Sequence, residues 1–267
     1  YSAEVGLVPA SGEDEPVNLT RSGYDDFRPR WLPGGVGMYW ASDRHGARMQ
    51  AGWAAERDVY AAFFDDEAWE RFQLSPAEYE QWKAKEKKDD SKEESPDGEP
   101  ADEQSEDREG EEPEPIEIEI EGLEDREVRL TMHSADLADA RVTPDGETLL
   151  YLAKFEQGYD LWAYEHRKKE VKQLAKLGAK SAGSLQVDAS GKKGFLLADK
   201  KLVSIDLASG KVSPVALQAR MQLDRDRERA YLFEHIWRQT REKFYVKDMH
   251  GVDWKMLKEE YAKFLPH

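Results

Sequence analysis

A glycine-centred turn recurs three times along this sequence, each time between two short apolar stretches. The three turns are Pro33-Gly34-Gly35, Pro144-Asp145-Gly146 and Ala189-Ser190-Gly191. A tight turn between antiparallel strands needs a positive φ, which glycine adopts without steric cost. The repeated turn therefore predicts a series of β-hairpins and a mainly β chain.

The spacing of the turns gives the size of the repeating unit. Gly146 and Gly191 lie 45 residues apart, whereas Gly35 and Gly146 lie 111 residues apart. Removing one 45-residue period from the longer interval leaves 66 residues, about the length of an acidic insertion with its flanks. Third and fourth apolar runs complete each unit, and four short strands every 40 to 50 residues or so are typical of β-propeller blades.

We expect four strands in each of three units. They centre on residues 31–32, 38–41, 59–62 and 128–130, then 142, 149–152, 161–164 and 171–174, then 185–187, 195–198, 202–205 and 215–221. Residues 4–20 resemble the outer half of an earlier blade. The prediction is thus a partial β-propeller over residues 1–223, with about three blades and part of a fourth. An open stack exposes an apolar face at each end, so we expect further blades before Tyr1 in a longer protein.

The negative charge is concentrated in one segment. Of the net charge of −17, residues 78–127 contribute −16, with 23 acidic and 7 basic side chains. Residues 86–115 hold no aromatic or aliphatic side chain larger than alanine, so they cannot bury enough apolar area to become ordered. We predict an acidic, disordered insertion near residues 83–115, entered by a helical stretch at 65–88 and left by an edge strand at 116–120. A tolerated loop and a docking element for a basic partner both remain open.

Composition excludes several classes of function. The acidic excess argues against a nucleic-acid partner or an anionic membrane surface, which both attract clustered Lys and Arg. No apolar run approaches the roughly 18 residues of a membrane span. The chain has no cysteine, so disulfides, thiolate metal sites and cysteine nucleophiles are excluded.

After Leu223 the periodicity becomes helical. One predicted helix begins after Asp224 or Asp226, and a second begins after Asp253, because an aspartate at these positions can cap a helix. Their apolar faces consist of Phe233, Ile236, Trp237, Thr240 and Phe244, and of Trp254, Leu257, Tyr261 and Leu265. Residues 224–267 are therefore predicted to be the start of a helical domain whose apolar faces need a partner.

The sequence offers no complete catalytic or metal-binding motif. It contains no Gly-x-Ser-x-Gly, no His-Glu-x-x-His and no phosphate-binding glycine loop. His235 is the most attractive of the six histidines, but we interpret it as a packed or surface side chain because no second ligand lies near it. We therefore predict no catalytic residue, no cofactor or cofactor-binding residue and no metal site. The other five histidines are His45, His133, His166, His250 and His267.

Two charged dipeptides and three tryptophans allow alternative interpretations. Asp43-Arg44 and Arg57-Asp58 could line a channel or pair with each other, although charges at strand ends usually solvate loops or join blades. A ligand platform could form from tryptophans, but packing between blades is favoured. The three tryptophans are Trp31, Trp40 and Trp53. Asp188, Asp199 and Asp206 do not have the spacing of a calcium loop.

Several strings resemble bacterial tricorn-type serine peptidases of the tail-specific, or C-terminal processing, protease group. They are PVNLTRSGYDDFRPRWLPGG, MYWASDRHGARMQAGW, RDVYAAFFDDEAWERFQLSPAEYE, YLAKFEQGYDLW and FEHIWRQTREKFYVKDMHGVDWKMLKEEYAKFLPH. The last string is the most specific, and it looks like the helical start of the protease region. The resemblance covers nearly the whole chain except the acidic insertion.

This resemblance implies propellers followed by a helical domain, a PDZ domain and an α/β domain with the nucleophilic serine. None of the family's catalytic motifs occurs here, and His267 does not match the family's catalytic histidine. The resemblance further implies peptide substrates, contacts with downstream PDZ and α/β domains of the same parent chain, and compatibility with a homo-oligomer. A periplasmic location fits better than a cytoplasmic one.

The leading hypothesis is a non-catalytic propeller and helical start of a tricorn-like serine peptidase that degrades oligopeptides. This part would shape substrate access and support the catalytic half. The alternative is a stand-alone β-propeller that binds proteins through the acidic loop. The propeller of a prolyl-oligopeptidase-like enzyme fits less well, since its strands would run into an α/β-hydrolase domain rather than into two helices.

Overall fold

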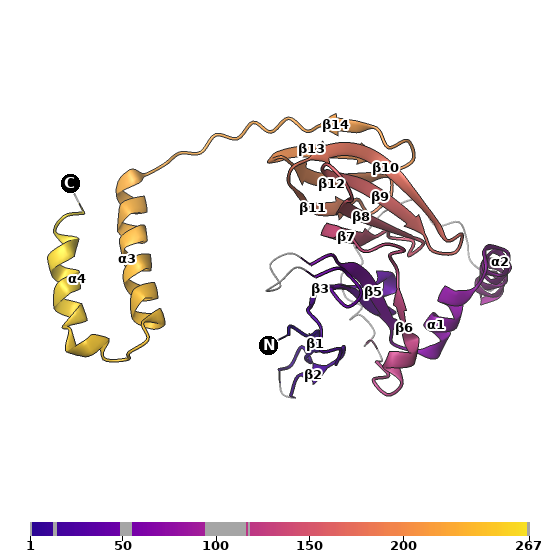
Figure 1. The fold of residues 1–267 in the computed structure, drawn as a ribbon, viewed down its shortest axis with the longest axis horizontal. Coiled ribbons are helices and arrows are strands. Elements are labelled where there is room, and N and C mark those ends of the chain that lie inside the picture. Colours follow the sequence, from indigo (N-terminus) through magenta and orange to yellow (C-terminus); the bar gives the residue numbers. More distant parts are fainter. Residues whose placement is uncertain (1, 13–14, 49–54, 94–115, 117, 266–267) are drawn as a thin grey trace, which may run out of the picture. The chain divides into compact units, whose positions relative to one another are not determined.

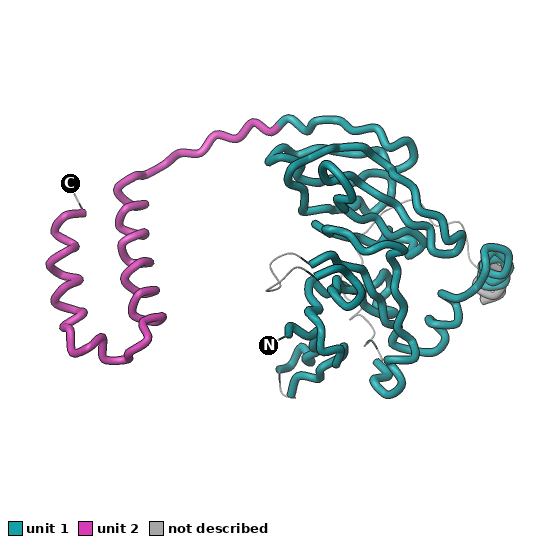
Figure 2. The backbone as a smooth tube through the Cα atoms, in the orientation of Figure 1, with its two compact units in different colours: residues 1–216 teal, residues 217–267 magenta. Residues whose placement is uncertain are grey.

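The computed structural model describes residues 2–12, 15–48, 55–93, 116 and 118–265. Within these residues the chain divides into two compact units, residues 1–216 and residues 217–267 (Figure 2). Each unit is described by itself below.

Unit 1 contains three four-stranded antiparallel sheets in which the strands follow chain order (Figure 1). The first sheet is β3 (Asp26–Trp31), β4 (Gly37–Ser42), β5 (Asp58–Phe63) and β6 (Glu127–Arg129). The second is β7 (Asp136–Val142), β8 (Thr148–Lys154), β9 (Tyr159–Glu165) and β10 (Glu170–Ala179). The third is β11 (Ala182–Val187), β12 (Lys193–Ala198), β13 (Lys201–Asp206) and β14 (Val212–Pro214). A two-stranded sheet, β1 (Gly6–Leu7) and β2 (Val17–Asn18), precedes them.

These meandering sheets are propeller blades, and the predicted fold class, a mainly β partial propeller followed by helices, is confirmed. The sheets are stacked face to face in Figure 1. The core lies between neighbouring blades in three apolar clusters. Tyr39 and Tyr151 belong to the cluster between the first two blades, Leu161 and Leu196 to the next, and Trp40 to the one beside β1. Alternating strand residues thus supply both packed faces of the first two sheets and one packed face of the third.

The predicted glycine turns join the first and second strand of every blade. Gly35, Gly146 and Gly191 have φ values of 74°, 76° and 67°. Each donates its backbone N–H to the carbonyl three residues earlier, on Leu32, Thr143 and Asp188, over 2.8 to 3.0 Å. The local requirement for positive φ therefore explains why the same residue type recurs at these positions.

Two helices follow β5 at the outer end of the first blade. Asp65 caps α1 (Asp66–Gln73) by accepting from the N–H of Ala68 at 2.7 Å. Ser75 and Glu78 form a capping box at the start of α2 (Pro76–Glu93): Glu78 Oε2 accepts from the Ser75 N–H at 2.9 Å. A short 3-10 helix, η3 (Leu123–Arg126), leads into β6.

The structure corrects three local predictions. The fourth strand of the third blade is β14 at Val212–Pro214, not residues 215–221, because Val203, Ser204 and Ile205 pair with 212–214. Residues 116 and 118–120 contain no strand; Glu119 makes a single backbone bond to Phe64 O at 3.0 Å. Alternating Ile and Glu gave a period-2 pattern, but no neighbouring strand pairs with these described residues.

The acidic insertion was predicted to be disordered from about residue 83, whereas α2 continues to Glu93. Eight of the residues 83–93 are Lys, Glu or Ala, which all favour a helix, and the capping box has already nucleated the helix before them. The remaining part of the predicted insertion, residues 94–115, lies outside the described residues.

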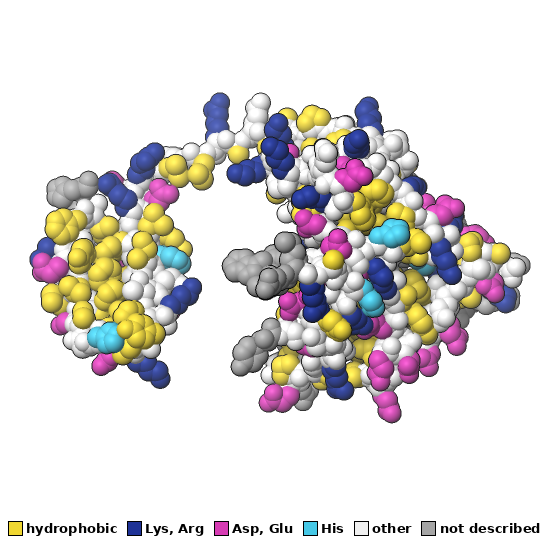
Figure 3. Space-filling view, in the orientation of Figure 1, with side chains coloured by type: hydrophobic (Ala, Val, Ile, Leu, Met, Phe, Trp, Pro, Cys, Tyr) yellow, Lys and Arg dark blue, Asp and Glu magenta, His cyan; other side chains and the backbone are white. Residues whose placement is uncertain are grey.

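Unit 2 consists of α3 (Arg225–Lys243), the 3-10 turn η4 (Met249–Gly251) and α4 (Trp254–Ala262). Of the two candidate caps, Asp224 caps α3 by accepting from the Arg227 N–H, and Asp253 caps α4 by accepting from the Met256 N–H at 2.9 Å. The Trp237 ring lies 4.4 Å from the Trp254 ring and 5.9 Å from the Tyr261 ring. The helices expose much apolar surface (Figure 3), which includes Tyr231, Ile236, Met256 and Phe264.

Candidate functional site

Both residues of the first charged dipeptide, Asp43-Arg44, have partners in or next to the first blade. The buried Asp43 carboxylate accepts from the Asp25 N–H at 3.0 Å and from Arg48 Nη2 at 2.8 Å. Arg44 pairs with Glu127 at the end of the same blade, and its guanidinium lies 4.6 Å from the centre of the Tyr60 ring. Burial and the nearby charge of Asp58 raise the pKa of Tyr60 to about 12. These contacts join strands within one blade.

The second charged dipeptide, Arg57-Asp58, does not pair with Asp43-Arg44. Asp58 is fully buried, and its carboxylate accepts from Arg129 Nη2 at 2.7 Å, Thr131 Oγ1 at 2.7 Å and Ser134 Oγ at 2.8 Å. Arg57 bonds through its backbone to Ala135, where the chain crosses to the next blade. The structure therefore uses Asp58 to hold the crossover between the first two blades.

The tryptophan platform, which the sequence analysis gave as the less favoured alternative, does not assemble among the described residues. Trp40 is 3% exposed and stacks on Tyr60 in the core, whereas Trp31 is 49% exposed and meets Phe64 edge to face. Trp53 lies outside the described residues. Trp40 is therefore a packing residue, as favoured from the sequence.

The remaining candidates have structural partners. Asp188 and Asp206 accept hydrogen bonds from the backbone N–H groups of Lys192 and Ser209 in their own turns, and Asp199 accepts from the Ser181 N–H just before β11. His235 stacks on Tyr231 of the same helix at 6.0 Å. His267 lies outside the described residues. In the described part of the chain, no cluster of three His, Cys, Asp or Glu residues could hold a metal ion. No helix there has the length and apolar composition to span a membrane.

A buried aspartate that the sequence did not single out joins three blades. Asp139, on β7, accepts from Arg30 Nη2 of β3 at 2.9 Å and from the Leu185 N–H of β11 at 2.9 Å. Arg141 Nη1 adds a third contact at 3.2 Å. The strands β3, β7 and β11 are the first strands of their blades, and each carries a register shift near these contacts. The shared bulge places these polar groups between blades.

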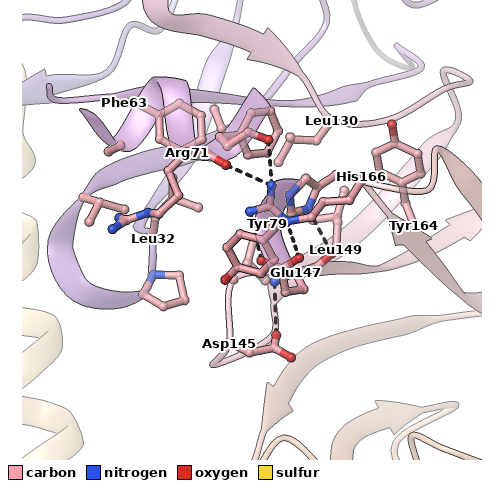
Figure 4. A pocket seen from close by; sticks show the side chains of 18 of the residues that line it. Leu32, Phe63, Arg71, Tyr79, Leu130, Asp145, Glu147, Leu149, Tyr164 and His166 are labelled. Carbon is pink, nitrogen blue, oxygen red and sulfur yellow. Dashed lines mark hydrogen bonds and ion pairs between the residues drawn. The ribbon is translucent and has the colours of Figure 1, made fainter. Parts of the chain in front are cut away.

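A pocket of about 180 Å³ lies between the first and second blades, beneath α1 and α2. One side of the pocket is apolar. It is lined by Phe63 at the end of β5, Leu130 just after β6 and Leu149 on β8. In Figure 4, Phe63 and Leu130 lie at the top of the pocket, and His166 and Glu147 lie below them.

Arg167 organises the polar side of this pocket. Its Nε and Nη2 atoms donate to the two carboxylate oxygens of Glu147 at 2.6 and 3.1 Å. Its Nη1 atom donates to the carbonyls of Arg71, Phe72 and Leu74 at 2.9, 3.2 and 3.0 Å. These carbonyls lie at and just after the end of α1, where that of Arg71 also accepts from the Leu74 N–H, at 3.4 Å, so Arg167 closes that helix.

The same guanidinium also contacts the next helix. It lies 3.6 Å from the centre of the Tyr79 ring of α2. Burial and the charge of Glu147 raise the pKa of the Tyr79 hydroxyl, which keeps it neutral. Arg167 therefore holds α1, α2 and the Glu147 carboxylate, just before β8, in one cluster.

His166 completes the polar side. Its Nδ1 donates to the carbonyl of Glu147 at 2.9 Å, so Nε2 carries the lone pair, and its ring stacks on Phe72 at 4.5 Å. Burial lowers the pKa of His166, although the charge of Glu147 opposes this shift. The imidazole is therefore held neutral.

This cluster was not predicted from the sequence because its members are far apart in the chain. Arg167 bonds to carbonyls 93 to 96 residues earlier. His166-Arg167 follows β9 in the turn between strands, a position where charged residues usually only solvate a loop. The one sequence signal for this cluster is the basic dipeptide His166-Arg167, in the blade next to the helical stretch. Such a dipeptide is not distinctive enough to predict the cluster.

The fold and these contacts define a class: a partial β-propeller, braced between blades by buried charges, followed by a helical unit. Residues 225–267 match the family model of the tricorn protease C1 domain. The predicted resemblance to tricorn-type peptidases is thereby confirmed for the segment that follows the blades.

Among the solved structures that match, that of the tricorn protease supports the fold. The crystal structure of the tricorn protease matches with a TM-score of 0.60 and 10% identity, covering 98% of this chain and 24% of that one. The β-propeller domain of the Trilobed protease from Pyrococcus furiosus matches with a TM-score of 0.36 and 10% identity, covering 74% and 44%. TolB from Acinetobacter baumannii gives a TM-score of 0.47 and 11% identity, covering 80% and 37%. The search of curated proteins found no match.

Proposed function

We propose that this chain is the non-catalytic propeller and helical start of a tricorn-like serine peptidase that degrades oligopeptides. The observation that carries the proposal is the match of residues 225–267 to the tricorn protease C1 domain, directly after three propeller blades. The blades shape the access of peptides, and α3 and α4 support the catalytic half. In the tricorn protease itself this length corresponds to about a quarter of the chain, 24%.

The helical unit supports the second part of this role. Its only buried apolar residue in the described range is Met249, while Tyr231, Ile236, Met256 and Phe264 remain exposed. Burying such side chains stabilises a contact by roughly 1.5 to 3 kcal/mol each. We propose that this surface packs against PDZ or α/β domains of the same parent chain, and that the parent's substrates are peptides.

The first test is the reading frame beyond His267. A PDZ region and an α/β domain with a nucleophilic serine are expected there. A stop codon directly after His267 would contradict the proposal and favour the stand-alone binding propeller.

The second test is peptide hydrolysis. The purified parent is expected to cleave oligopeptides and to lose activity with a serine-directed organophosphate, whereas the 267-residue chain alone is expected to be inactive. Turnover by the 267-residue chain that a single Ser or His substitution abolishes would place the catalytic machinery here and overturn the non-catalytic role.

A further inference from the structure

The pocket between the first two blades has the size and lining of a ligand site. Its volume of about 180 Å³ is slightly larger than the roughly 150 Å³ of engineered apolar cavities that bind benzene. One six-membered ring therefore fits inside it, and any larger part of the ligand remains outside. Its walls combine aliphatic side chains such as Leu149 with the rings of Phe63 and Phe72, whose centroids are 4.7 Å apart.

The aromatic lining continues to the surface. Tyr79 and Trp82 on α2 stack on each other with centroids 5.6 Å apart and an interplanar angle of 8°. Both belong to the pocket lining, and both are only half-buried. Because Trp82 and Arg167 already cover the faces of Tyr79, a ring entering past it meets its edge, and edge-to-face contacts attract another ring beyond the effect of area burial alone.

The chain's own acidic insertion does not supply such a group. Residues 86–115 contain no aromatic side chain and no aliphatic side chain larger than alanine. Ile116, the first large aliphatic residue after them, lies beside Gly35: its Cδ1 atom would be 2.7 Å from a Cβ at that position. The occupant is therefore a ligand from outside this segment.

On the polar side of the pocket, the Glu147–Arg167 pair is already satisfied, whereas His166 Nε2 has no hydrogen-bond partner among the described residues. Glu147 and Arg167 pair through two bonds, and Arg167 also fixes the end of α1. These groups are not available for a charged ligand, and they hold both helices in place over the apolar space. We propose that this pocket binds a single aromatic ring, either free or as the side chain of a peptide. The proposal is independent of the proposed peptidase role.

The experiment uses the whole 267-residue chain and two matched ligand pairs. Phenol is compared with cyclohexanol by isothermal titration calorimetry, because the two differ in aromaticity but little in size. N-acetylphenylalaninamide is compared with N-acetylalaninamide. Phenol is expected to bind in the millimolar range or tighter, about two- to tenfold more tightly than cyclohexanol. Binding of the phenylalanine amide indicates a peptide-borne ring, and binding of phenol alone indicates a free aromatic ligand.

Pocket-filling variants locate the binding. Val36→Phe, in the turn before β4, and Val142→Phe, at the end of β7, each place a ring in the space and are expected to abolish phenol binding. Val212→Phe makes the same change on β14, outside this pocket, and is expected to keep it. Thermal unfolding checks that each variant is folded. One folded filling variant, Val36→Phe or Val142→Phe, is enough to test where phenol binds. Absence of phenol binding to the unmodified chain, or binding that survives in a folded filling variant, overturns the proposal.

Discussion

Buried carboxylates in this protein join strands that are distant in sequence. Asp58 and Asp139 both lie at the first or third strand of a blade and accept hydrogen bonds from beyond that strand. A buried charge is tolerated only where its oxygens have donors, and both residues meet that condition with three or more. Asp58 therefore holds the crossover between the first two blades, and Asp139 joins the first strands of three blades.

Asp58→Ala tests this structural role. Because the Asp58 side chain is 0% exposed, its removal leaves Arg129 and two hydroxyl groups without their acceptor, and we expect a loss of about 3 to 5 kcal/mol in unfolding free energy. Urea unfolding monitored by circular dichroism measures it. Lys172→Ala breaks the exposed Lys172–Glu165 pair in the same unit and is expected to change stability by less than about 1 kcal/mol. Equal effects of the two variants would contradict the role of Asp58.

His166 predicts a pH dependence of stability. Its pKa is lowered in the folded protein by burial, so the unfolded chain binds more protons as the pH falls below the ordinary histidine value of about 6.5. The stabilisation is therefore complete above that value and is lost as the pH falls through the lower, folded pKa. The groups facing His166 are Glu147, Arg167 and Asp145.

The measurement is the urea midpoint of the natural chain and of His166→Gln at pH 8 and at pH 5. The natural chain is expected to lose more stability than His166→Gln over this interval, since glutamine does not titrate. A difference between the two proteins that stays constant with pH would exclude a buried neutral His166.

At the scale of the elements, local rules explain most boundaries. Asp65, Asp224 and Asp253 each begin a helix with a side-chain cap, as the residue type predicts. The end of α1 is different, because its carbonyls are closed by Arg167 from another blade. Helix starts were therefore readable from the sequence, whereas this helix end depends on a tertiary contact.

Alanine substitutions at two turn glycines distinguish the cost of backbone strain from the cost of a steric clash. Gly146 and Gly210 have φ values of +76° and +72°, but a Cβ at Gly146 would meet no atom within 4 Å, whereas one at Gly210 would lie 2.0 Å from Leu174 O of β10. Gly146→Ala is expected to cost about 1 to 2 kcal/mol for the backbone conformation alone.

Gly210→Ala is expected to cost a further 1 to 3 kcal/mol or so, because the turn must move away from β10. Chemical unfolding of the two variants side by side measures the difference. Equal destabilisation would mean that the β13–β14 turn does not approach β10 as closely as described.

At the scale of the whole molecule, the two units are joined by an extended segment without a strand. Leu217, Met221 and Leu223 in this segment are 74%, 78% and 50% exposed. Apolar side chains at alternating positions had suggested a strand, but alternation alone does not supply a hydrogen-bonding neighbour. The connection therefore belongs to neither a blade nor a helix.

Limited chymotrypsin digestion tests this organisation. The enzyme prefers large apolar side chains, which residues 86–115 lack, so the acidic insertion does not compete for cleavage. The first cut is expected at residues 217–223, and the N-terminal fragment is expected to keep its β circular dichroism and its cooperative unfolding. Intact-mass measurement identifies the site. A first cut within a described strand, or loss of structure on cutting at 217–223, would contradict the division into two units.

The sequence by itself determined the features that depend on neighbouring residues: the glycine turns with positive φ, the period of the blades, the helix starts and the resemblance carried by the last string. The tertiary structure decided which distant groups meet. Arg30 and Asp139 are 109 residues apart, and Arg167 reaches carbonyls more than 90 residues away. Turn and cap preferences act over a few bonds and leave a pattern in the sequence, whereas contacts between stacked blades depend on how whole sheets pack. The pocket, the Asp139 junction and the closure of α1 therefore became visible only in the folded chain.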